Sequence, residues 1–460
     1  MSHIIQDETR YMDEVKSLNL NREQKYRIKT FGCQMNENDS EKIAGILEAM
    51  GYSQSTEDSG YDIVVYNTCC VRESAENKIY GHLGMEKKTK EANPDLIVAL
   101  CGCMAQQEEA VAAIRKSYPH VDIVFGTHNI HRFPALLFQL LRNECSQFEV
   151  VPDSEGIVEC LPVKRRSKAE AYVPVMYGCD NFCSYCIVPY VRGREKSRSY
   201  GEIRREVESL VHAGVREITL LGQNVNSYGK NTEECMDFAG LLSRLQDTEG
   251  LERIRFMTSH PKDISENLLI AIRDLPKVCK HLHLPLQSGS TRVLRDMNRN
   301  YTKEHYISIL ENIAREIPGI GLSTDVIVGF PGETEEDFQD TLDILERIRF
   351  DFAYTFIYSK RRHTPAADRT DMVPDEVKSE RFDRLVRLQN AITLENNLKE
   401  IGKTMPVLVT GPSRNPPGMF TGRTGSNKIV HFSGNPAMTG KIINILIKDA
   451  KTWHLEGEAL

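Results

Sequence analysis

Apolar and polar positions in the first part of the chain alternate between short β-like runs and helical patterns. Three β-like runs, rich in β-branched and aromatic residues, lie at 26–31, 61–66 and 96–100. A helical pattern follows each run, at 39–50, 74–88 and 105–116. Strands that alternate with helices build parallel sheets, so residues 24–141 are predicted to form a doubly wound α/β domain, preceded by a tail at 1–23.

The same alternation returns after a polar stretch at 142–163, which is predicted to be a linker. Six β-like runs, each leading into a helical pattern, lie at 172–176, 217–224, 253–259, 281–287, 322–329 and 352–359. Six such units are fewer than the eight of a closed barrel. We therefore expect residues 164–396 to form an open, partial (β/α)6 barrel with its chemistry at the carboxyl ends of the strands.

The pattern changes again after a long helical segment at 375–398. Short β-like runs broken by Gly, Pro, Asn and Ser fill residues 397–460 and predict a small all-β domain. Over 397–455, eight Lys and Arg stand against two acidic residues, a balance of +6 in a chain of net charge −7. This domain is therefore expected to contact nucleic acid. Four of its residues either stack on bases or fill its core: Phe420, His431, Phe432 and Trp453.

Composition narrows the class of protein. The 460 residues are 40% apolar and 27% charged, which is typical of a folded globular chain and argues against a disordered or collagen-like one. The longest apolar runs fall far short of the ~20 residues that span a bilayer, and the start of the chain lacks a signal-peptide pattern. We expect no membrane contact, a cytoplasmic location and reduced thiols.

Twelve cysteines in a reducing compartment indicate metal binding or catalysis before disulfides. Three of them, here called the loop trio, share one loop after the run at 172–176: Cys179, Cys183 and Cys186. A structural zinc site needs four ligands, and no fourth Cys or His lies nearby in the sequence. Three thiolates with one open position fit a cubane iron-sulfur cluster better, and the open iron is then a binding site.

A second set, here called the dispersed trio, consists of Cys33, Cys69 and Cys103, which follow the ends of the first three β-like runs. Ligands in such sheets gather outside the carboxyl ends of the strands, so these thiols are expected to converge on a second cluster with a vacant position. Side-chain alternation predicts that Cys70 points away from Cys69 and that Cys101 shares a face with Cys103. Cys70 and Cys101 remain alternative ligands.

The spacing of the loop trio, with Tyr185 before its last thiol, resembles the signature of the radical S-adenosylmethionine superfamily. Three further segments are FGCQMNENDSE at 31–41, NTCCVRESAENK at 67–78 and GCMAQ at 102–106. Together with the terminal β domain, they make the chain resemble the methylthiotransferases of that superfamily over about residues 24–456. The resemblance implies that the terminal domain is a TRAM-like, RNA-binding domain.

The resemblance also implies an activity: insertion of a methylthio group at C2 of N6-isopentenyladenosine beside the anticodon of a tRNA. It implies two [4Fe-4S] clusters, one on each trio, and two molecules of S-adenosylmethionine. The loop cluster would cleave S-adenosylmethionine, and the dispersed trio would hold the cluster that gives up sulfur. A reducing electron donor such as a flavodoxin or ferredoxin is expected as a partner.

Other substrates and another class of protein remain as alternatives. Relatives that act on threonylcarbamoyladenosine or a ribosomal-protein aspartate typically carry GCPKN or GCKVN where this chain has Gly32 to Asn36. That segment, together with Val71-Arg72-Glu73, favours the isopentenyl substrate. A non-catalytic zinc protein that binds RNA is the alternative from another class. The chain departs from the family at Cys70, where a small residue such as Ser is usual.

Further residues are expected to contact S-adenosylmethionine. The resemblance implies Tyr185 at the cofactor adenine, Gln223 at the methionine amino group and Gln287 at the ribose hydroxyls. Val328, within the segment 325–333, is expected at the adenine. Core packing is the alternative for Tyr185, and turn capping is the alternative for the two glutamines.

Two polar patterns near these residues are less specific. His281 and His283 alternate along one β-like run and are expected to be structural. The basic run from Arg192 to Arg198 directly follows the loop trio. It is expected to hold the tRNA backbone or the cofactor carboxylate, or to be a solvated loop.

Overall fold

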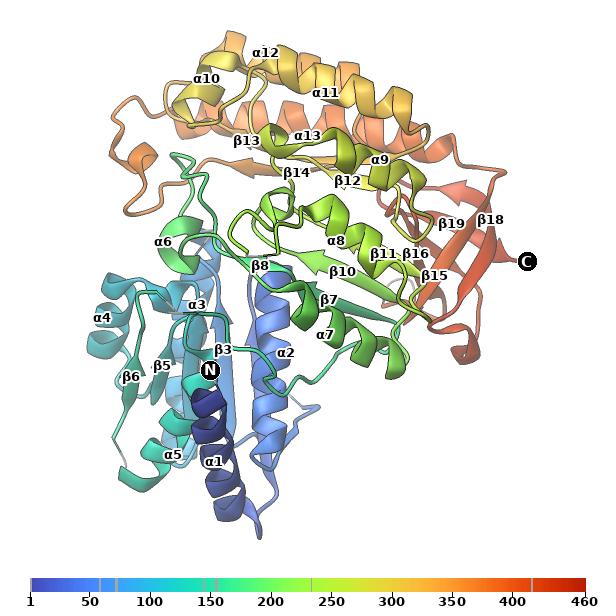
Figure 1. The fold of residues 1–460 in the computed structure, drawn as a ribbon. Helices are drawn as coiled ribbons and strands as arrows, with labels where there is room; N and C mark the ends of the chain where they lie inside the picture. The colour runs from blue at the N-terminus through green and yellow to red at the C-terminus, as the bar shows by residue number, and fades with distance from the viewer. Residues whose placement is uncertain are drawn as a thin grey trace.

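The computed structural model describes residues 2–57, 59–70, 73–143, 145–153, 156–232, 234–414 and 417–460. Figure 1 shows an amino-terminal α/β domain in blue to teal, a central domain in green to orange, and a small β domain in red beside the central one. Within the described ranges, no helix combines the length and apolar content that a bilayer crossing requires.

The amino-terminal domain is built on one six-stranded parallel sheet with the order β2-β1-β3-β4-β5-β6. Its strands are β1 (Gln24–Thr30), β2 (Tyr52–Gln54), β3 (Ile63–Thr68), β4 (Ile97–Gly102), β5 (Ile123–Phe125) and β6 (Gln147–Glu149). The predicted doubly wound sheet is confirmed. The sequence pattern missed β2, β5 and β6 because three residues are too few to show a period. β6 also places the start of the expected linker, 142–163, inside the sheet.

Helices cover both faces of this sheet (Figure 1). They are α1 (Ser2–Asn19), α2 (Gln34–Ala49), α3 (Glu73–Ala92), α4 (Glu108–Ser117) and α5 (Phe133–Asn143), with 3-10 turns at Met104–Gln106 and Ile130–Arg132. α1, α2 and α5 bury one apolar cluster against the sheet, and α3 and α4 bury another on the opposite face. Both faces are therefore closed, which is typical of a parallel sheet.

The expectation that residues 1–23 form a tail is wrong, because α1 packs on the domain. Val15 is fully buried, and the ring centroid of Tyr11 lies 5.6 Å from that of Phe138 on α5. Arg132 forms an ion pair with Glu8 at 3.0 Å. The sequence pattern does not indicate this helix because charged residues separate its few apolar positions. These positions are buried by contact with α5.

The central domain has six parallel strands in two three-stranded sheets, β11-β10-β7 and β12-β13-β14, joined by a parallel bridge between Ile254 and Val278. The strands are β7 (Glu170–Pro174), β10 (Glu217–Leu221), β11 (Arg253–Phe256), β12 (His281–His283), β13 (Gly321–Val328) and β14 (Phe352–Ile357). A single large apolar cluster fills the space between the strands and their helices. The predicted partial (β/α)6 barrel is confirmed.

The helices of the barrel are α7 (Tyr200–His212), α8 (Phe238–Leu245), α9 (Glu266–Asp274), α10 (Thr291–Asp296), α11 (Lys303–Glu316), α12 (Glu335–Ile348) and α13 (Asp375–Leu398). Six of them, α7 to α12, begin at side-chain caps, which explains where they start, whereas α13 follows Pro374 and has no side-chain cap. A short hairpin of β8 (Met176–Tyr177) and β9 (Lys196–Ser197) encloses α6 (Val188–Arg192). The six caps accept a bond from the third backbone N–H of their helix: Ser199, Asp237, Ser265, Ser290, Thr302 and Thr334. Further 3-10 turns lie at Val225–Ser227, Pro261–Asp263 and Pro365–Asp368.

The carboxyl-terminal domain is a closed five-stranded barrel with the order β15-β16-β17-β19-β18, as its sequence pattern predicts. Its strands are β15 (Thr404–Pro412), β16 (Phe420–Thr424), β17 (Ile429–Phe432), β18 (Ile442–Ala450) and β19 (Leu455–Ala459), with a 3-10 turn at Pro436–Met438. Phe420 and Phe432 are buried in its apolar core and His431 is buried beside it, so core filling is the correct alternative for these three. Trp453 is 56% exposed.

Two buried arginines of the central barrel hold the small barrel in place. Arg253 donates to the carbonyl oxygen of Arg423 at 2.8 Å, and Arg255 donates to that of Thr424 at 2.5 Å. Arg255 also forms a buried ion pair with Glu217 at 2.7 Å. The turn between β16 and β17 is thereby fixed at the amino-terminal ends of the barrel strands.

Asp337 completes a capping box at the start of α12 and gives a testable prediction. Burial opposes its ionisation, but hydrogen bonds from Arg292, Ser290 and Thr334 prevail and lower its pKa to about 2. Because the pKa is lower in the folded state, its stabilisation is present above about pH 4 and is lost as the pH falls towards 2. We expect Asp337→Asn to lower the free energy of unfolding by about 2 kcal/mol at neutral pH.

Urea unfolding followed by circular dichroism at several pH values measures this effect. The gap between the wild type and Asp337→Asn should be constant at neutral pH and should narrow below about pH 4. A gap that stays constant or widens on acidification would show that Asp337 is not the stabilising carboxylate.

Candidate active site

The dispersed trio gathers at one edge of the amino-terminal sheet. Cys33 follows β1, whereas Cys69 and Cys103 directly follow the neighbouring strands β3 and β4. A Cβ added to Gly32 would lie 3.1 Å from the Cys69 Sγ, so the backbone before Cys33 touches the side chain of Cys69. The Cys103 N–H donates to the carbonyl oxygen of Thr68 at 2.9 Å. The expected convergence of the three positions is therefore present, with Cys33 exposed and the other two thiols buried.

Arg192 reaches this edge from the central domain, at the end of α6. It is buried, and its Nη2 donates to Asn36 Oδ1 at 3.1 Å and to Asp39 Oδ2 at 3.0 Å. Burial opposes its charge, but Cys103, Asp39 and Cys33 outweigh burial and raise the pKa of Arg192. The guanidinium is thus fixed as a cation beside two thiols of the dispersed trio.

Cys70 and Cys101 have different surroundings. A hydrogen bond with Cys103 raises the pKa of Cys70 and lowers that of Cys103, which Arg192 lowers further. Cys70 therefore adjoins the dispersed trio. Cys101 points into the core formed with α2 and α5, so the prediction that it shares a face with Cys103 is wrong. Gly102, at φ +92°, turns the chain between these two residues.

The loop trio lies between β8 and α6, at the carboxyl-terminal ends of the barrel strands. The Cys179 N–H donates to Gly193 O at 3.1 Å, and the Cys186 N–H donates to Cys183 O at 2.9 Å. Ser184, within the loop, donates through its hydroxyl to Asp296 O at 2.7 Å. These bonds fix the loop against β9 and α10.

The thiols of the loop trio interact electrostatically with one another. Burial raises the pKa of Cys179 to about 11 and also raises that of Cys186, and Cys183 adds to both shifts. Asn181 donates to Cys179 Sγ at 3.4 Å, and Arg299 donates to Cys183 Sγ at 3.6 Å. No sequence pattern indicates Arg299, because a lone arginine after α10 belongs to no motif.

The donor set of both trios fits iron-sulfur clusters. Among the described residues, no three Cys, His, Asp or Glu side chains lie close enough together to hold a single metal ion. Zinc draws its four ligands around one atom, whereas the three thiolates of a cubane bind three different irons and are farther apart. Three thiols at each site, with Arg299 beside Cys183 and Arg192 beside Cys103, are a donor set that fits the three protein-bound irons of a cubane. The ligand roles of the six cysteines remain predictions.

The residues expected to contact S-adenosylmethionine lie at the carboxyl-terminal side of the barrel. Gln223 follows β10, Val328 ends β13, and Gln287 bridges to β13 at φ +68°. Among the described residues, the side-chain amides of Gln223 and Gln287 have no hydrogen-bond partner, so each remains available to a ligand. Tyr185 packs against the small apolar cluster around Phe330. This contact agrees with core packing, the alternative to a contact with the cofactor adenine.

The basic run after the loop trio is largely structural. Arg192 and Arg198 are buried, and Arg198 pairs with Glu159 at 2.6 Å and with Glu206 at 2.7 Å. These two arginines therefore connect segments of the protein, and the expectation that they hold an RNA backbone is wrong. Arg194 is exposed and pairs with Asp180.

Two other expectations concern the histidine pair of β12 and the segment 71–73. His281 and His283 are buried, and both contact Ser323 Oγ at 3.0 Å, in agreement with a structural role. Val71 and Arg72 lie outside the described residues, as does the side chain of Glu73.

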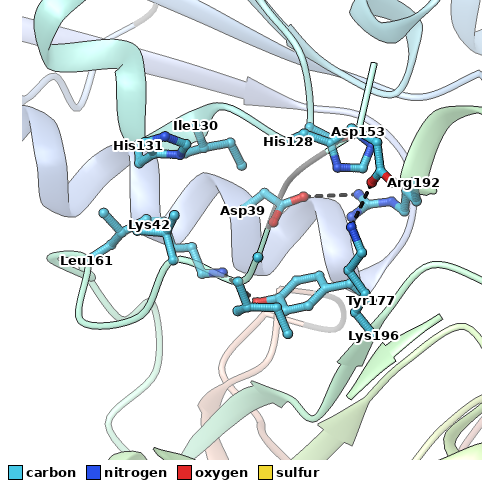
Figure 2. A pocket seen from close by; sticks show the side chains of 14 residues that line it. Asp39, Lys42, His128, Ile130, His131, Asp153, Leu161, Tyr177, Arg192 and Lys196 are labelled. Carbon is cyan, nitrogen blue, oxygen red and sulfur yellow. Dashed lines mark hydrogen bonds and ion pairs between the residues drawn. The ribbon is translucent and has the colours of Figure 1, made fainter. Parts of the chain in front are cut away.

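A cavity lies next to Arg192, between the amino-terminal domain, the central domain, and Asp153 with residues 156–161 (Figure 2). Figure 2 shows the pair of Arg192 and Asp39 at its wall, and Lys42 Nζ donates to the Tyr177 hydroxyl at 3.0 Å across the domain boundary. Charged contacts thus hold the two domains together beside the dispersed trio.

Comparison with known proteins matches three family models in the order of the domains. Residues 25–126 match an uncharacterized protein family, UPF0004, residues 173–345 match the radical SAM superfamily, and residues 398–460 match the TRAM domain. The radical S-adenosylmethionine methyltransferase TsrM from Kitasatospora setae, solved with tryptophan and a SAM analogue bound, has a TM-score of 0.52 over 75% of both chains. At 14% identity, this likeness concerns the fold alone.

Two curated relatives extend the match to nearly the whole chain. A tRNA-2-methylthio-N(6)-dimethylallyladenosine synthase of Acetivibrio thermocellus is 55% identical over 97% of this chain and 95% of its own length. One of Alkaliphilus oremlandii is 52% identical over 99% and 97%. The fold, the two trios and these matches define a radical S-adenosylmethionine methylthiotransferase.

Within that class, the chain belongs to the family of the tRNA-2-methylthio-N(6)-dimethylallyladenosine synthases. The family predicted from the sequence is confirmed.

Gly102 offers a test of the dispersed trio. A Cβ at this position would lie 2.4 Å from Thr68 O, and φ is +92°. We expect Gly102→Ala to cost about 1–3 kcal/mol of strain. It should reduce the iron bound by the amino-terminal domain after anaerobic reconstitution, measured by metal analysis.

Gly84 is the matched control, because it lies in helix α3 with no atom within 4 Å of an added Cβ. Gly84→Ala should stabilise the helix by about 0.5–1 kcal/mol and leave the iron content unchanged. Equal iron contents in the two variants would contradict the importance of the turn at Gly102.

Proposed function

We propose that this chain is a tRNA methylthiotransferase that places a methylthio group on C2 of N6-dimethylallyladenosine, the isopentenyladenosine beside the anticodon. The observation that carries the proposal is the position of Arg192. This residue ends the helix that follows the loop trio, and it faces Cys33 and Cys103 of the dispersed trio. Both thiol sites therefore lie next to one region between the two domains.

The residues present fit two [4Fe-4S] clusters and S-adenosylmethionine. When bound, these groups supply the one-electron cleavage of S-adenosylmethionine, the radical that acts on adenine C2, and the sulfur. The chain itself supplies the thiolates and fixes their loops. Arg299 donates to Cys183 Sγ at 3.6 Å and opposes the rise in the pKa of Cys186 that burial causes. A hydrogen bond with Cys70 and the charge of Arg192 lower the pKa of Cys103, so a buried guanidinium lies beside each trio.

The carboxyl-terminal side of the barrel is proposed to bind S-adenosylmethionine. Gln287 is held at a positive φ by two backbone bonds to β13: its N–H donates to Asp325 O at 2.8 Å, and its carbonyl accepts from Ile327 at 2.9 Å. Such a conformation is costly for glutamine and is typical of binding sites. Its amide is proposed to meet the ribose, that of Gln223 the methionine amino group, and Val328 the adenine.

Gln34 supports the choice of the adenosine substrate over the alternatives. Asn36 is common to all the segments compared and has a structural role, donating to Thr68 O at 2.8 Å. Gln34 differs between them, and its side chain lies near the hydroxyl of Tyr172 on β7, where it opposes the rise in the pKa of Tyr172 that burial causes. A residue at this boundary between domains is placed to distinguish substrates.

Two further assignments belong to the proposal. Reduction needs an electron from outside the chain, and a flavodoxin or ferredoxin is the proposed donor. The cytoplasm is the proposed location, because tRNA and reduced thiols occur there together.

Two cysteine variants separate the roles of the trios. We expect Cys183→Ala to abolish cleavage of S-adenosylmethionine, because the loop trio then lacks a ligand. Cys69→Ala should retain cleavage but yield no methylthio product. Chromatography of the cleavage product and of nucleosides from the treated tRNA measures both activities.

Cys145 provides the control for these variants, because it is exposed and adjoins β6, away from both trios. Cys145→Ala should keep both activities. Methylthio product from Cys69→Ala would contradict the assignment of the dispersed trio and would transfer the ligand role to Cys70.

A further inference from the structure

A row of aromatic rings crosses the boundary between the barrel and the small β domain. The ring centroid of Trp453 lies 5.8 Å from that of Phe352, which lies 4.7 Å from that of Tyr354. His283 continues the row into the barrel, 5.7 Å from Tyr354. We call Trp453, Phe352 and Tyr354 the ring row.

The ring row is open to solvent. Trp453 is 56% exposed and Tyr354 is 41% exposed, although aromatic side chains of this size are usually covered. Phe352 and Tyr354 belong to β14, which lies at the edge of its sheet and also exposes Ile357. Exposed apolar residues on an edge strand indicate a surface that a partner covers.

Positive charge and a hollow accompany the rings. The ring row lines a cavity together with Arg423, Lys428 and His454 of the small domain. Lys428 is already paired with Asp351 at 2.6 Å. Arg423 donates to Asn427 Oδ1 at 3.1 Å and, among the described residues, forms no ion pair, so its charge remains available to a phosphate.

We propose that the ring row and Arg423 form a binding site for an unpaired nucleotide of the RNA, with the base on Trp453 and the phosphate at Arg423. This inference rests on the proposed function and adds a second contact to it, separate from the adenosine that reacts. Unpaired bases of an RNA are splayed out and stack on exposed aromatic rings, and such stacking tolerates any base. The small domain docks at the end of the barrel strands opposite the thiol sites, so the base held here is one distant from the reacting adenosine.

The basic character of the small domain favours RNA over a protein as the partner. Its balance of +6 over residues 397–455 attracts a polyanion, whereas the rest of the chain is acidic. Phe352 and Tyr354 come from β14 of the central barrel, whereas Trp453 and Arg423 come from the small domain. The site is therefore complete only when the small domain is held on the barrel, as it is by Arg253 and Arg255.

Tryptophan fluorescence tests the site directly, because Trp453 is the sole tryptophan of the chain. The probe is an anticodon stem–loop RNA carrying N6-dimethylallyladenosine, added to the full-length protein. We expect the RNA to quench the emission of Trp453 with the same half-saturation as its binding measured by anisotropy of a labelled copy. A blunt duplex of the stem alone should not quench it.

Variants then measure the contribution to affinity. Trp453→Ala and Tyr354→Ala should each weaken RNA binding about tenfold, and Trp453→Phe should largely restore it. Arg423→Gln should reduce the salt dependence of binding by about one phosphate contact. Tyr11→Ala, on the amino-terminal domain, is the control and should leave RNA affinity unchanged.

The outcomes distinguish this inference from the proposed function. If the RNA binds Trp453→Ala with unchanged affinity and does not change the fluorescence emission of the wild type, the proposed nucleotide site is overturned. That result would leave the proposed methylthiotransferase activity unaffected. RNA that fails to bind the wild type at all would overturn both. A dimer of the wild type that dissociates in Trp453→Ala, seen by sedimentation, would show that the ring row joins copies of this chain and would overturn the inference.

Discussion

The contact on which the arrangement depends is the buried interaction of Arg192 with Asp39 and Asn36. A buried guanidinium is costly unless it is paired and fully hydrogen-bonded, so its partners on α2 determine where α6 can lie. α6 directly follows Cys186, and the thiols of Cys33 and Cys103 lie beside the same guanidinium. One charged contact therefore joins two domains and brings the two thiol sites to one region. The same positive charge adds to the hydrogen bond with Cys70 in lowering the pKa of Cys103.

The three domains then have complementary tasks. The amino-terminal sheet offers its carboxyl-terminal edge, where the dispersed trio collects, and the central barrel offers the corresponding end of its own strands, where the loop trio and Gln287 lie. The small barrel docks at the other end of the strands through Arg253 and Arg255. It therefore lies at the end of the barrel opposite the thiol sites, where we propose that it holds the RNA.

Much of this organisation follows from the sequence because it depends on periodicity and spacing. The long strands and the loop trio are visible as patterns, whereas β2, β5 and β6 are too short to have a period. The sequence does not predict the packing of α1, because its burial depends on α5, a tertiary contact. The prediction that Cys101 shares a face with Cys103 is wrong because the positive φ of Gly102 breaks the side-chain alternation of the strand. The burial of Arg192 and the contact of Arg299 with Cys183 depend on residues distant in sequence, so local patterns predicted neither.

Counting iron and acid-labile sulfide per chain, after anaerobic reconstitution, tests the central claim most directly. Two cubane clusters predict about eight of each per wild-type chain, and about four when the three cysteines of either trio are replaced by alanine. A chain that holds zinc, or that keeps its full iron content after the replacement of one trio, would contradict the account.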